Sequence, residues 1–355
     1  MPAEKTFIPF QDIRKYKDVL VVDSYYPEAF NLSHWRGAPK SELLLDDTST
    51  GIVLNAIKRN IPQLKAPYVT NNHFDIDGFL GVWSLLNPGL ALENEVILRE
   101  MALIGDFREL NLSKPFGDEA LKLVCWINST EKAEFYPPFG ASGEMKLCIE
   151  KYNFYLKEFS KVLSNPEDYQ DAWDLEFQLV KHHYNLVNRE IKNTETIPEI
   201  KLLIVKAPHP LHYYALFSNS SSYDMVMSIY PENRYELEYK YTTWIDTAFR
   251  SSFPRMDLLP LANKLTNLEK SGKTWTCDKI TDTGPILRLS GRKLTKEQRF
   301  DHPYNREIKK SSLHPEEFKN IIIKYYQEMY KNIKPRNNWS WQEIKDLNQN
   351  TILDY

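Results

Sequence analysis

One imidazole and two carboxylates fall within five residues of this chain. His73, Asp75 and Asp77 follow a short apolar segment at 66–70 and precede Gly78 and an apolar run. Alternate residues of an extended segment share a face, so both carboxylates can reach one ion. Imidazole and carboxylate ligands suit a divalent cation, and the N–H groups that begin the next helix suit an anion. The segment therefore predicts a metal or phosphate-processing corner.

Other interpretations of these residues differ in strength. An EF-hand loop needs Gly at its sixth position, whereas Gly78 is fourth counted from Asp75, which excludes that type of calcium site. Asp75 and Asp77 could instead serve only as turn and helix-capping residues, which is common for Asp. This capping interpretation stays open beside the metal site. His182 and His183 are expected to be an exposed and a packed helix residue rather than ligands.

The surrounding segments alternate between strand and helix patterns. Residues 18–25 form a near-continuous apolar run, typical of a strand buried on both faces of a parallel sheet. Residues 51–58 predict a helix that Asp47, Ser49 or Thr50 can cap. Residues 95–104 predict another helix, with Gly105 at C′ and Asp106 just beyond it. This alternation favours an α/β fold, in which strand-to-helix turns sit at the ligand-binding edge.

The later segments change character. Residues 152–163 and 173–189 carry apolar residues at helical spacing, whereas 200–206, 224–230 and 235–245 predict strands. The third strand alternates between two sets of side chains, which predicts that one face is buried and the other exposed. The set expected to be buried is Leu237, Tyr239 and Tyr241, and the set expected to be exposed is Glu236, Glu238 and Lys240. A helix is predicted at 255–269, another at 313–333, and a polar tail that packs back through Trp339 and Trp341.

The expected fold class is α/β, with a mainly parallel N-terminal sheet, a helical insertion and a smaller α+β C-terminal domain. The expected domains are residues 1–120, residues 121–195, and residues 196–355 with a helical tail. The length of 355 residues allows this number of parts. A cleft between the two outer parts is the expected place for a ligand.

The bulk composition is that of a soluble globular protein, with 42% hydrophobic and 26% charged residues. The net charge of −3 disfavours a membrane-surface protein and a general nucleic-acid binder, leaving short oligonucleotides as the largest expected nucleic-acid partner. Three widely spaced cysteines with no Cys-x-x-Cys pair indicate neither a disulfide framework nor a zinc ribbon. No targeting segment or long apolar run occurs, so a cytoplasmic protein is expected. Oligomeric state stays open.

The segment His73–Gly78 resembles the first signature motif of the DHH phosphoesterase superfamily, in which a His, two alternate Asp residues and a small residue end a strand. This resemblance implies Mn²⁺ or Mg²⁺ as cofactor and hydrolysis of phosphodiester or phosphoanhydride bonds. It implies that His73, Asp75 and Asp77 are catalytic metal ligands, with Asp106 as a further candidate. The Asp-His-His triplet that names the superfamily does not occur in the chain.

Residues 245–262 resemble the strand, Arg-Ser and helix pattern of substrate domains associated with DHH enzymes. Those domains continue into a Gly-Gly-x-His loop, which residues 281–288 lack. If the architecture is shared, Arg250, Arg255 and Arg288 can grip a phosphate or carboxylate bidentately. As isolated surface residues they would have no such role.

Five segments are together similar to a family of uncharacterised bacterial proteins, a match that spans most of the chain and implies no established activity. These segments are residues 32–37, 47–50, 72–78, 102–107 and 281–285. His34, Ser49 and Thr50 are candidates for the opposite wall of the cleft and for substrate binding, although a buried anchor and an ordinary cap are equally open. His212 is a further substrate-binding candidate.

We therefore expect a divalent-metal-dependent, phosphoesterase-like hydrolase of a small phosphorylated molecule or short nucleotide. The alternative is a non-catalytic ligand- or partner-binding protein that retains a DHH-like fold, which the missing triplet favours. A third possibility is a metal-independent enzyme in which His34 or His212 is a general base.

Overall fold

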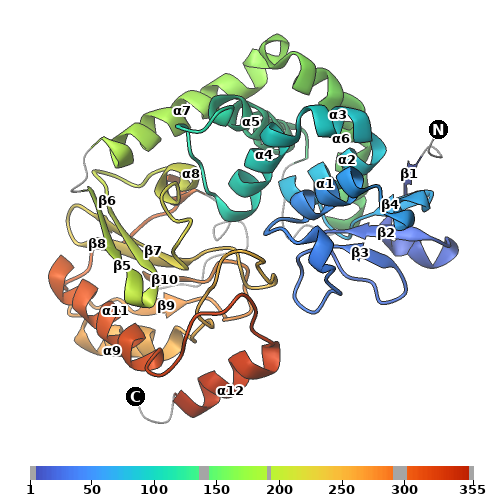
Figure 1. Ribbon diagram of the computed structural model, residues 1–355. Coiled ribbons are helices and arrows are strands. Elements are labelled where there is room, and N and C mark those ends of the chain that lie inside the picture. Colours follow the sequence, from blue (N-terminus) through green and yellow to red (C-terminus); the bar gives the residue numbers. More distant parts are fainter. Residues whose placement is uncertain (1–4, 136–143, 190–192, 291–301, 352–355) are drawn as a thin grey trace. The chain divides into compact units, whose positions relative to one another are not determined.

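A computed structural model describes residues 5–135, 144–189, 193–290 and 302–351 (Figure 1). The chain divides into two compact units by its contacts. Unit 1 comprises Met1–Gln178 and Ile245–Phe249, and unit 2 comprises Leu179–Trp244 and Arg250–Tyr355. The class is mixed α/β, with a parallel sheet in unit 1 and a mixed sheet in unit 2. The predicted fold class is confirmed, whereas the predicted three domains stay a prediction.

The sheet of unit 1 consists of four short parallel strands, in the spatial order β1-β4-β2-β3. Their bounds are Thr6–Phe7 (β1), Val19–Val22 (β2), Phe30–Leu32 (β3) and Tyr68–Thr70 (β4). Every residue of β2 is buried, because the strand is central and both faces of the sheet are covered. This confirms the buried parallel strand predicted from the apolar run, and it explains why the run does not alternate.

Helices α1 and α2 pack on the sheet and on each other (Figure 1). Helix α2 is buried along almost its whole length, since α6 covers its outer side with aromatic rings such as Phe159, whose ring centroid lies 5.3 Å from that of Phe79. The helices of this unit are α1 (Ser49–Arg59), α2 (Ile76–Leu86), α3 (Pro88–Glu93), α4 (Glu95–Phe107), α5 (Gly117–Glu134), α6 (Glu144–Ser164) and the first half of α7 (Gln170–Asn188). None of the helices in the described ranges is long and apolar enough to cross a membrane.

Two predicted helix ends are wrong. Gly105 lies inside α4, where an added Cβ would stand 2.5 Å from Cβ of Ile76, so glycine is needed for close packing and not for a cap. Arg108 ends α4 in the left-handed conformation, with φ 58°, and Asp106 belongs to the last turn of the helix. Helix α1 is capped by Thr48, whose side chain accepts the N–H of Gly51.

Unit 2 is built on a six-stranded sheet in the order β5-β6-β7-β8-β10-β9. Only β6 and β7 pair in parallel, and the other pairs are antiparallel. The strands are β5 (Thr194–Ile197), β6 (Leu202–Lys206), β7 (Met225–Tyr230), β8 (Arg234–Tyr239), β9 (Trp275–Cys277) and β10 (Ile286–Leu289).

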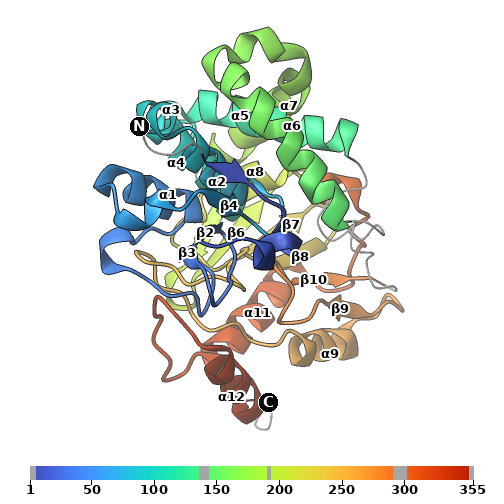
Figure 2. The same cartoon turned by 90° about the vertical axis from the view of Figure 1, so that its right-hand side faces the viewer.

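Both faces of this sheet are covered. Leu202 and Ile204 join one apolar cluster with α9 and α11, while Leu203 and Val205 join another with α8 and the end of α7. The helices α9 and α11 lie along the sheet in both views (Figure 1 and Figure 2). The bounds are Tyr213–Leu216 (α8), Leu259–Leu268 (α9), Pro315–Met329 (α11) and Trp341–Thr351 (α12). The predicted packing of the tail is confirmed, since Trp339 is buried and its Nε1 donates to the carbonyl of Ser252.

The prediction of one exposed face on β8 is wrong, because Glu236 and Glu238 of β8 are buried, as is Lys240 just beyond it. Arg306 places its guanidinium 2.8 Å from Oε2 of Glu236 and 3.5 Å from Oε2 of Glu238. Lys240 donates from Nζ to the carbonyl of Ser220. The second face is therefore buried through ion pairs and hydrogen bonds rather than through apolar contact.

Replacing Gly81 tests the close approach of α2 to β2. An added Cβ would stand 2.6 Å from Cγ1 of Val22 in the sheet. We expect Gly81→Ala to lower the free energy of unfolding by about 1–3 kcal/mol, measured by urea titration, because the core must move to admit the methyl group. Gly89→Ala is the matched control: it is exposed, meets nothing within 4 Å and should be neutral or stabilising by about 0.5–1 kcal/mol. Equal stability of both variants would contradict the packing described here.

We expect the histidine His183 to make the stability of unit 2 depend on pH. It is buried, and its Nδ1 accepts the backbone N–H of His212 at 2.9 Å, which requires the neutral ring. Burial and the nearby imidazoles of His209 and His182 lower its pKa to about 4. Because the folded pKa lies below the unfolded one, this stability is complete above pH 6.5 and is lost as pH falls toward 4.

We expect His183→Asn to remove part of that pH dependence, because the amide oxygen of Asn can accept the same N–H and does not titrate. Urea unfolding at pH 7, 6 and 5 should show a loss of about 2 kcal/mol in the wild type and a smaller loss in the variant. The exposed neighbour His182, replaced by Gln, should leave most of the wild-type dependence in place. A wild-type profile that is flat over this range would show that the neutral ring is not required.

Candidate metal centre

Three neighbouring parallel strands end at one edge of the unit 1 sheet, and a possible ligand follows each of them. Asp23 follows β2 directly, His34 lies two residues beyond β3, and His73 lies three residues beyond β4. Helix α2 then begins at Ile76, after Asp75. Because the carboxyl ends of parallel strands share one edge, these side chains meet there.

The carboxylate of Asp23 stands between two imidazoles. Its Oδ1 lies 3.1 Å from Nε2 of His34, and its Oδ2 lies 3.3 Å from Nε2 of His73. The backbone of Asp23 is left-handed, with φ 47°, a conformation that Asp tolerates better than most residues. Ser49 donates from Oγ to Oδ1 at 2.7 Å, and the Asp23 side chain is buried. One carboxylate therefore offers an oxygen to each imidazole.

Both imidazoles are oriented through their other nitrogen. Nδ1 of His34 lies 2.7 Å from the carbonyl oxygen of Asp47, and Nδ1 of His73 lies 2.7 Å from Oδ1 of Asn72. A carbonyl oxygen can only accept, so Nδ1 carries the hydrogen in each ring. Nε2 then points its lone pair, or in the imidazolium its proton, at the carboxylates. Metal-binding histidines are held in this way, with the far N–H on a carbonyl or carboxylate.

The possible ligands form two groups that share Asp23. The inner group is Asp23, His34, Asp77 and Asp106, and the outer group is Asp23, His73 and Asp75. Nε2 of His34 lies 3.8 Å from Oδ2 of Asp77 and 3.8 Å from Oδ2 of Asp106. That oxygen of Asp106 is buried and has no hydrogen-bond partner among the residues that the structure describes. A buried carboxylate oxygen without a hydrogen bond is uncommon in a folded protein, and this one lies where it could bind a cation beside His34.

The groups differ in their exposure to solvent. The side chains of His34 and Asp77 are 2% and 0% exposed, whereas those of His73 and Asp75 are 35% and 42% exposed. Nε2 of His73 lies 3.0 Å from Oδ2 of Asp75. Solvent therefore reaches this centre from the outer group.

Asp75 and Asp77 also hold helix ends. Asp75 caps α2, accepting the N–H of Gly78 on Oδ1 at 2.8 Å, which leaves Oδ2 for His73. Asp77 accepts the N–H of Ser49 on Oδ2 and that of Thr50 on Oδ1, at 2.7 and 2.8 Å, so it binds the start of α1 rather than of its own helix. Each carboxylate oxygen has two lone pairs, so neither set of bonds excludes a cation.

Gly78 permits the tight turn at this edge. A Cβ there would stand 2.0 Å from Nδ2 of Asn71 and 3.1 Å from Oδ2 of Asp23. Asn71 in turn donates from Nδ2 to the hydroxyl of Tyr152 at 3.1 Å. A side chain at position 78 would therefore displace the amide that lines the back of the centre.

The centre brings four carboxylates to two imidazoles, and burial opposes the charged forms of Asp77 and Asp106. Burial and the Asp23 charge raise the pKa of Asp77 to about 7, and burial raises that of Asp106 well above its usual range. Burial alone would lower the pKa of His34, but Asp106 and Asp23 raise it to about 10. Burial of Asp23 is outweighed by hydrogen bonds to His34 and His73, which keep its pKa below the usual range. Two divalent cations would match the four carboxylates with both rings neutral.

The distances fit shared cations. Within each group the named nitrogen-to-oxygen separations run from 3.0 to 3.8 Å. Neighbouring ligands of an octahedral ion with bonds of 2.0–2.1 Å stand about 3 Å apart, so small movements would bring both groups onto ions. One imidazole among several carboxylates favours Mn²⁺ over Mg²⁺, which prefers oxygen ligands alone.

The other predicted substrate-binding residues fall into two sets. Ser49 and Thr50 lie in the centre, where they bind Asp77 and Asp23. The rest belong to unit 2, and they are His212, Arg250, Arg255 and Arg288. Arg255 donates to the carbonyls of Thr283 and Asp282, which gives it a structural role in that unit. Their contact with a substrate stays a prediction.

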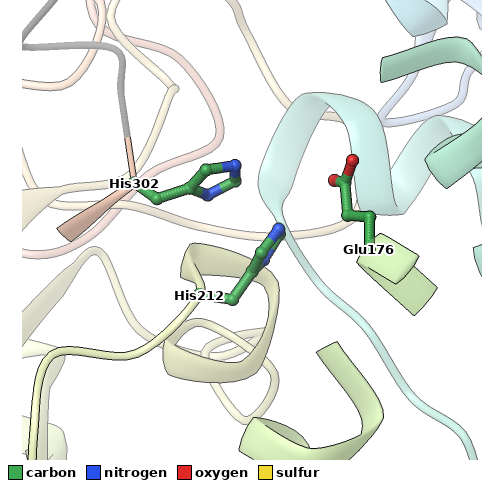
Figure 3. Close-up of side chains that lie close together, drawn as sticks. All are labelled: Glu176, His212 and His302. Atoms are coloured by element: carbon green, nitrogen blue, oxygen red, sulfur yellow. The ribbon is translucent and has the colours of Figure 1, made fainter. Parts of the chain in front are cut away.

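His212 has aromatic and backbone partners in unit 2. Its ring centroid lies 4.0 Å from that of His302, and the two rings are drawn together in Figure 3. Nδ1 of His212 accepts the N–H of Tyr214, so a neutral ring carries its hydrogen on Nε2. Glu176, also labelled in Figure 3, accepts hydrogen bonds from Asn128 and Ser129 within unit 1. His212 is thus a helix cap packed against aromatic rings.

Sequence reasoning missed Asp23, although a signal was present. It is the polar residue directly after the buried strand β2, and His73 likewise lies just beyond a strand, three residues after β4. Asp47 was considered only as a helix cap, whereas its carbonyl orients His34. No local pattern pointed to that role, because the two residues are 13 positions apart.

Comparisons with known proteins identify the family of the chain but assign it no activity. No curated protein and no solved structure matches the chain significantly, so the resemblance to the DHH superfamily rests on the motif alone. A family model described as a family of unknown function (DUF6687) matches residues 3–337, nearly the whole chain. This agrees with the expected similarity to an uncharacterised family. The chain belongs to this family of unknown function.

Proposed function

We propose that unit 1 is a divalent-metal-dependent hydrolase of a small phosphorylated molecule or short nucleotide. The observation that carries the proposal is the carboxylate of Asp23, which offers one oxygen to each of two imidazoles whose Nδ1 atoms are anchored on carbonyl oxygens. Such a carboxylate could bridge two cations, each also held by one imidazole. The resemblance of His73–Gly78 to the first DHH motif supports phosphate ester or anhydride chemistry.

The buried and the partly exposed ligands would have different roles. A divalent cation, when bound, supplies a Lewis acid for a phosphoryl oxygen and lowers the pKa of a water. The inner group would fix its cation away from solvent, since His34 and Asp77 are buried. The outer group would face the substrate, since His73 and Asp75 are partly exposed. Mn²⁺ is the preferred cation and Mg²⁺ the alternative.

One observation favours a non-catalytic ligand-binding protein instead. Both oxygens of Asp77 accept N–H groups from α1, and Asp75 caps α2, so these carboxylates stabilise the fold without a cation. In that case the carboxylates and imidazoles of the centre would stabilise unit 1 through ion pairs and hydrogen bonds, without a cation. Cation binding and hydrolysis separate the two proposals.

Calorimetric titration of metal-stripped protein with Mn²⁺ tests the centre. We expect two ions in the wild type, with tighter binding at the inner group because it holds more carboxylates and is shielded from water. Asp23→Asn should lose both ions, since the shared carboxylate loses its charge while keeping its shape. His34→Gln and His73→Gln should each lose one. The exposed carboxylate Asp171, changed to Asn, is the control and should bind as the wild type does.

The same proteins are then assayed with phosphodiester and pyrophosphate substrates in Mn²⁺. Hydrolysis by the wild type that Asp23→Asn abolishes would support the enzyme. Ions bound without hydrolysis would favour the ligand-binding alternative. A wild type that binds no cation would refute the metal centre itself.

The variant Asp106→Asn separates a ligand from a structural residue. Its buried Oδ2 lacks a hydrogen-bond partner among the described residues and lies near the other carboxylates, so its charge opposes folding when no cation is present. We expect the metal-free variant to be more stable than the wild type at pH 8, by about 1–2 kcal/mol in urea unfolding. It should also bind the inner Mn²⁺ more weakly.

Asp171→Asn should change neither quantity, because surface substitutions usually stay within about 0.5 kcal/mol. A metal-free Asp106→Asn protein that is less stable than the wild type would mean that the charge of Asp106 is satisfied by the fold, which argues against a ligand.

A further inference from the structure

A segment from far along the chain lies against the residues that orient His34. Ile245–Phe249 belongs to unit 1, although the residues on either side of it belong to unit 2. Ile245 pairs with Trp35 in an isolated antiparallel bridge, and Arg36 donates to the carbonyl of Ile245 at 3.0 Å. We call this the docked segment.

The docked segment holds both partners of the hydrogen bond that orients His34. The N–H of Asp246 donates to the carbonyl of His34 at 2.8 Å. The N–H groups of Ala248 and Phe249 donate to Oδ1 of Asp47 at 2.7 and 2.8 Å. The carbonyl of the same Asp47 accepts Nδ1 of His34. Three amides of the docked segment therefore bind His34 and Asp47, the two residues whose mutual hydrogen bond orients the imidazole.

Charge fixes the segment further. The carboxylate of Asp246 lies 3.3 Å from Nη1 of Arg36 and 3.1 Å from Nζ of Lys40. Asp47, Asp246 and Thr247 are buried, so the bonds made there are shielded from water. Buried hydrogen bonds to a carboxylate are stronger than neutral ones and costly to leave unmade.

We infer that Asp47 and the docked segment are positioning elements for the inner group, so that binding of its cation and docking of the segment stabilise each other. This rests on the proposed metal centre. Asp47 touches neither cation nor substrate; it fixes the tautomer and direction of His34, whose Nε2 faces Asp23, Asp77 and Asp106. Coupling between two binding events is reciprocal, so each can be measured through the other.

The first experiment uses the wild-type chain and amide hydrogen exchange, without and with Mn²⁺. We expect the ion to slow exchange at the amides of Asp246, Ala248 and Phe249 by about tenfold or more, because the segment must undock for these amides to exchange. His34→Gln should abolish this effect, while His73→Gln should retain it. Unchanged exchange at these amides in a wild type that binds the inner ion would overturn the inference.

The second experiment measures Mn²⁺ affinity in Asp47 variants. Asp47→Ala keeps the carbonyl that accepts from His34 but removes the carboxylate that binds the docked segment, so the carbonyl is no longer fixed in place. We expect it to weaken the inner ion by about 10–100-fold, the range for partners of a metal-binding histidine, and to leave the outer ion unchanged. Asp47→Asn should restore much of the affinity, since its amide oxygen accepts the same N–H groups. The control is Asp224→Ala in unit 2, which removes another carboxylate bonded to a backbone N–H, that of Phe253, and should not alter either ion.

The outcomes are distinct from those of the proposed function. If the wild type binds no Mn²⁺, the metal centre fails and this inference falls with it. If the wild type binds two ions and Asp47→Ala binds both with unchanged affinity, the centre stands and the positioning role is wrong. Equal weakening of both ions in Asp47→Ala would indicate general loosening of unit 1, which also refutes a role specific to His34.

Discussion

The carboxylate of Asp23, held between the imidazoles of His34 and His73, is the interaction on which the architecture of unit 1 depends. To serve both rings, β2 must lie between the strands that lead to them, and it pairs with β3 on one side and β4 on the other. The left-handed backbone at Asp23 turns its side chain into the edge of the sheet. The absence of a side chain at Gly78 leaves the space that the amide of Asn71 occupies, close to this carboxylate.

Such a centre is expensive for the fold, because four carboxylates lie close together and three of them are largely shielded from water. Part of the cost is offset by backbone dipoles. Helix α1 directs its first N–H groups at Asp77, and helix α2 directs that of Gly78 at Asp75, so two helix N-termini face negative charge. Burial of the apolar helix α2 between the sheet and the aromatic side chains of α6 also stabilises unit 1. The carboxylates at this edge of the sheet thus lower the free energy of unfolding of unit 1, and the helix N-termini and the apolar core oppose that loss.

Sequence reasoning could predict the features that local pattern determines. The buried run of β2, the turn at His73–Asp77 and the helices α6 and α7 follow from composition and spacing over a dozen residues or fewer. It could not predict what distant segments decide. Glu236 and Glu238 have the spacing of exposed residues, and the ion pairs that accompany their burial come from Arg306, 70 positions from Glu236. The position of Asp23 directly after a buried strand is a local signal, but its role between two imidazoles is not, since His34 and His73 lie 11 and 50 positions away along the chain.

The docked segment also constrains the order in which the chain can acquire its structure. Asp47 and its partners Ala248 and Phe249 are separated by 201 and 202 positions, which makes this one of the longest loops that folding of unit 1 must close. During synthesis the sheet and α1 to α6 emerge long before Ala248 and Phe249, whose amides bind Oδ1 of Asp47. A ribosome-bound chain that stops before residue 245 has every candidate ligand yet lacks the amides that hold His34 in place. If the docked segment positions His34 as proposed, completion of the inner group follows the synthesis of more than two thirds of the chain.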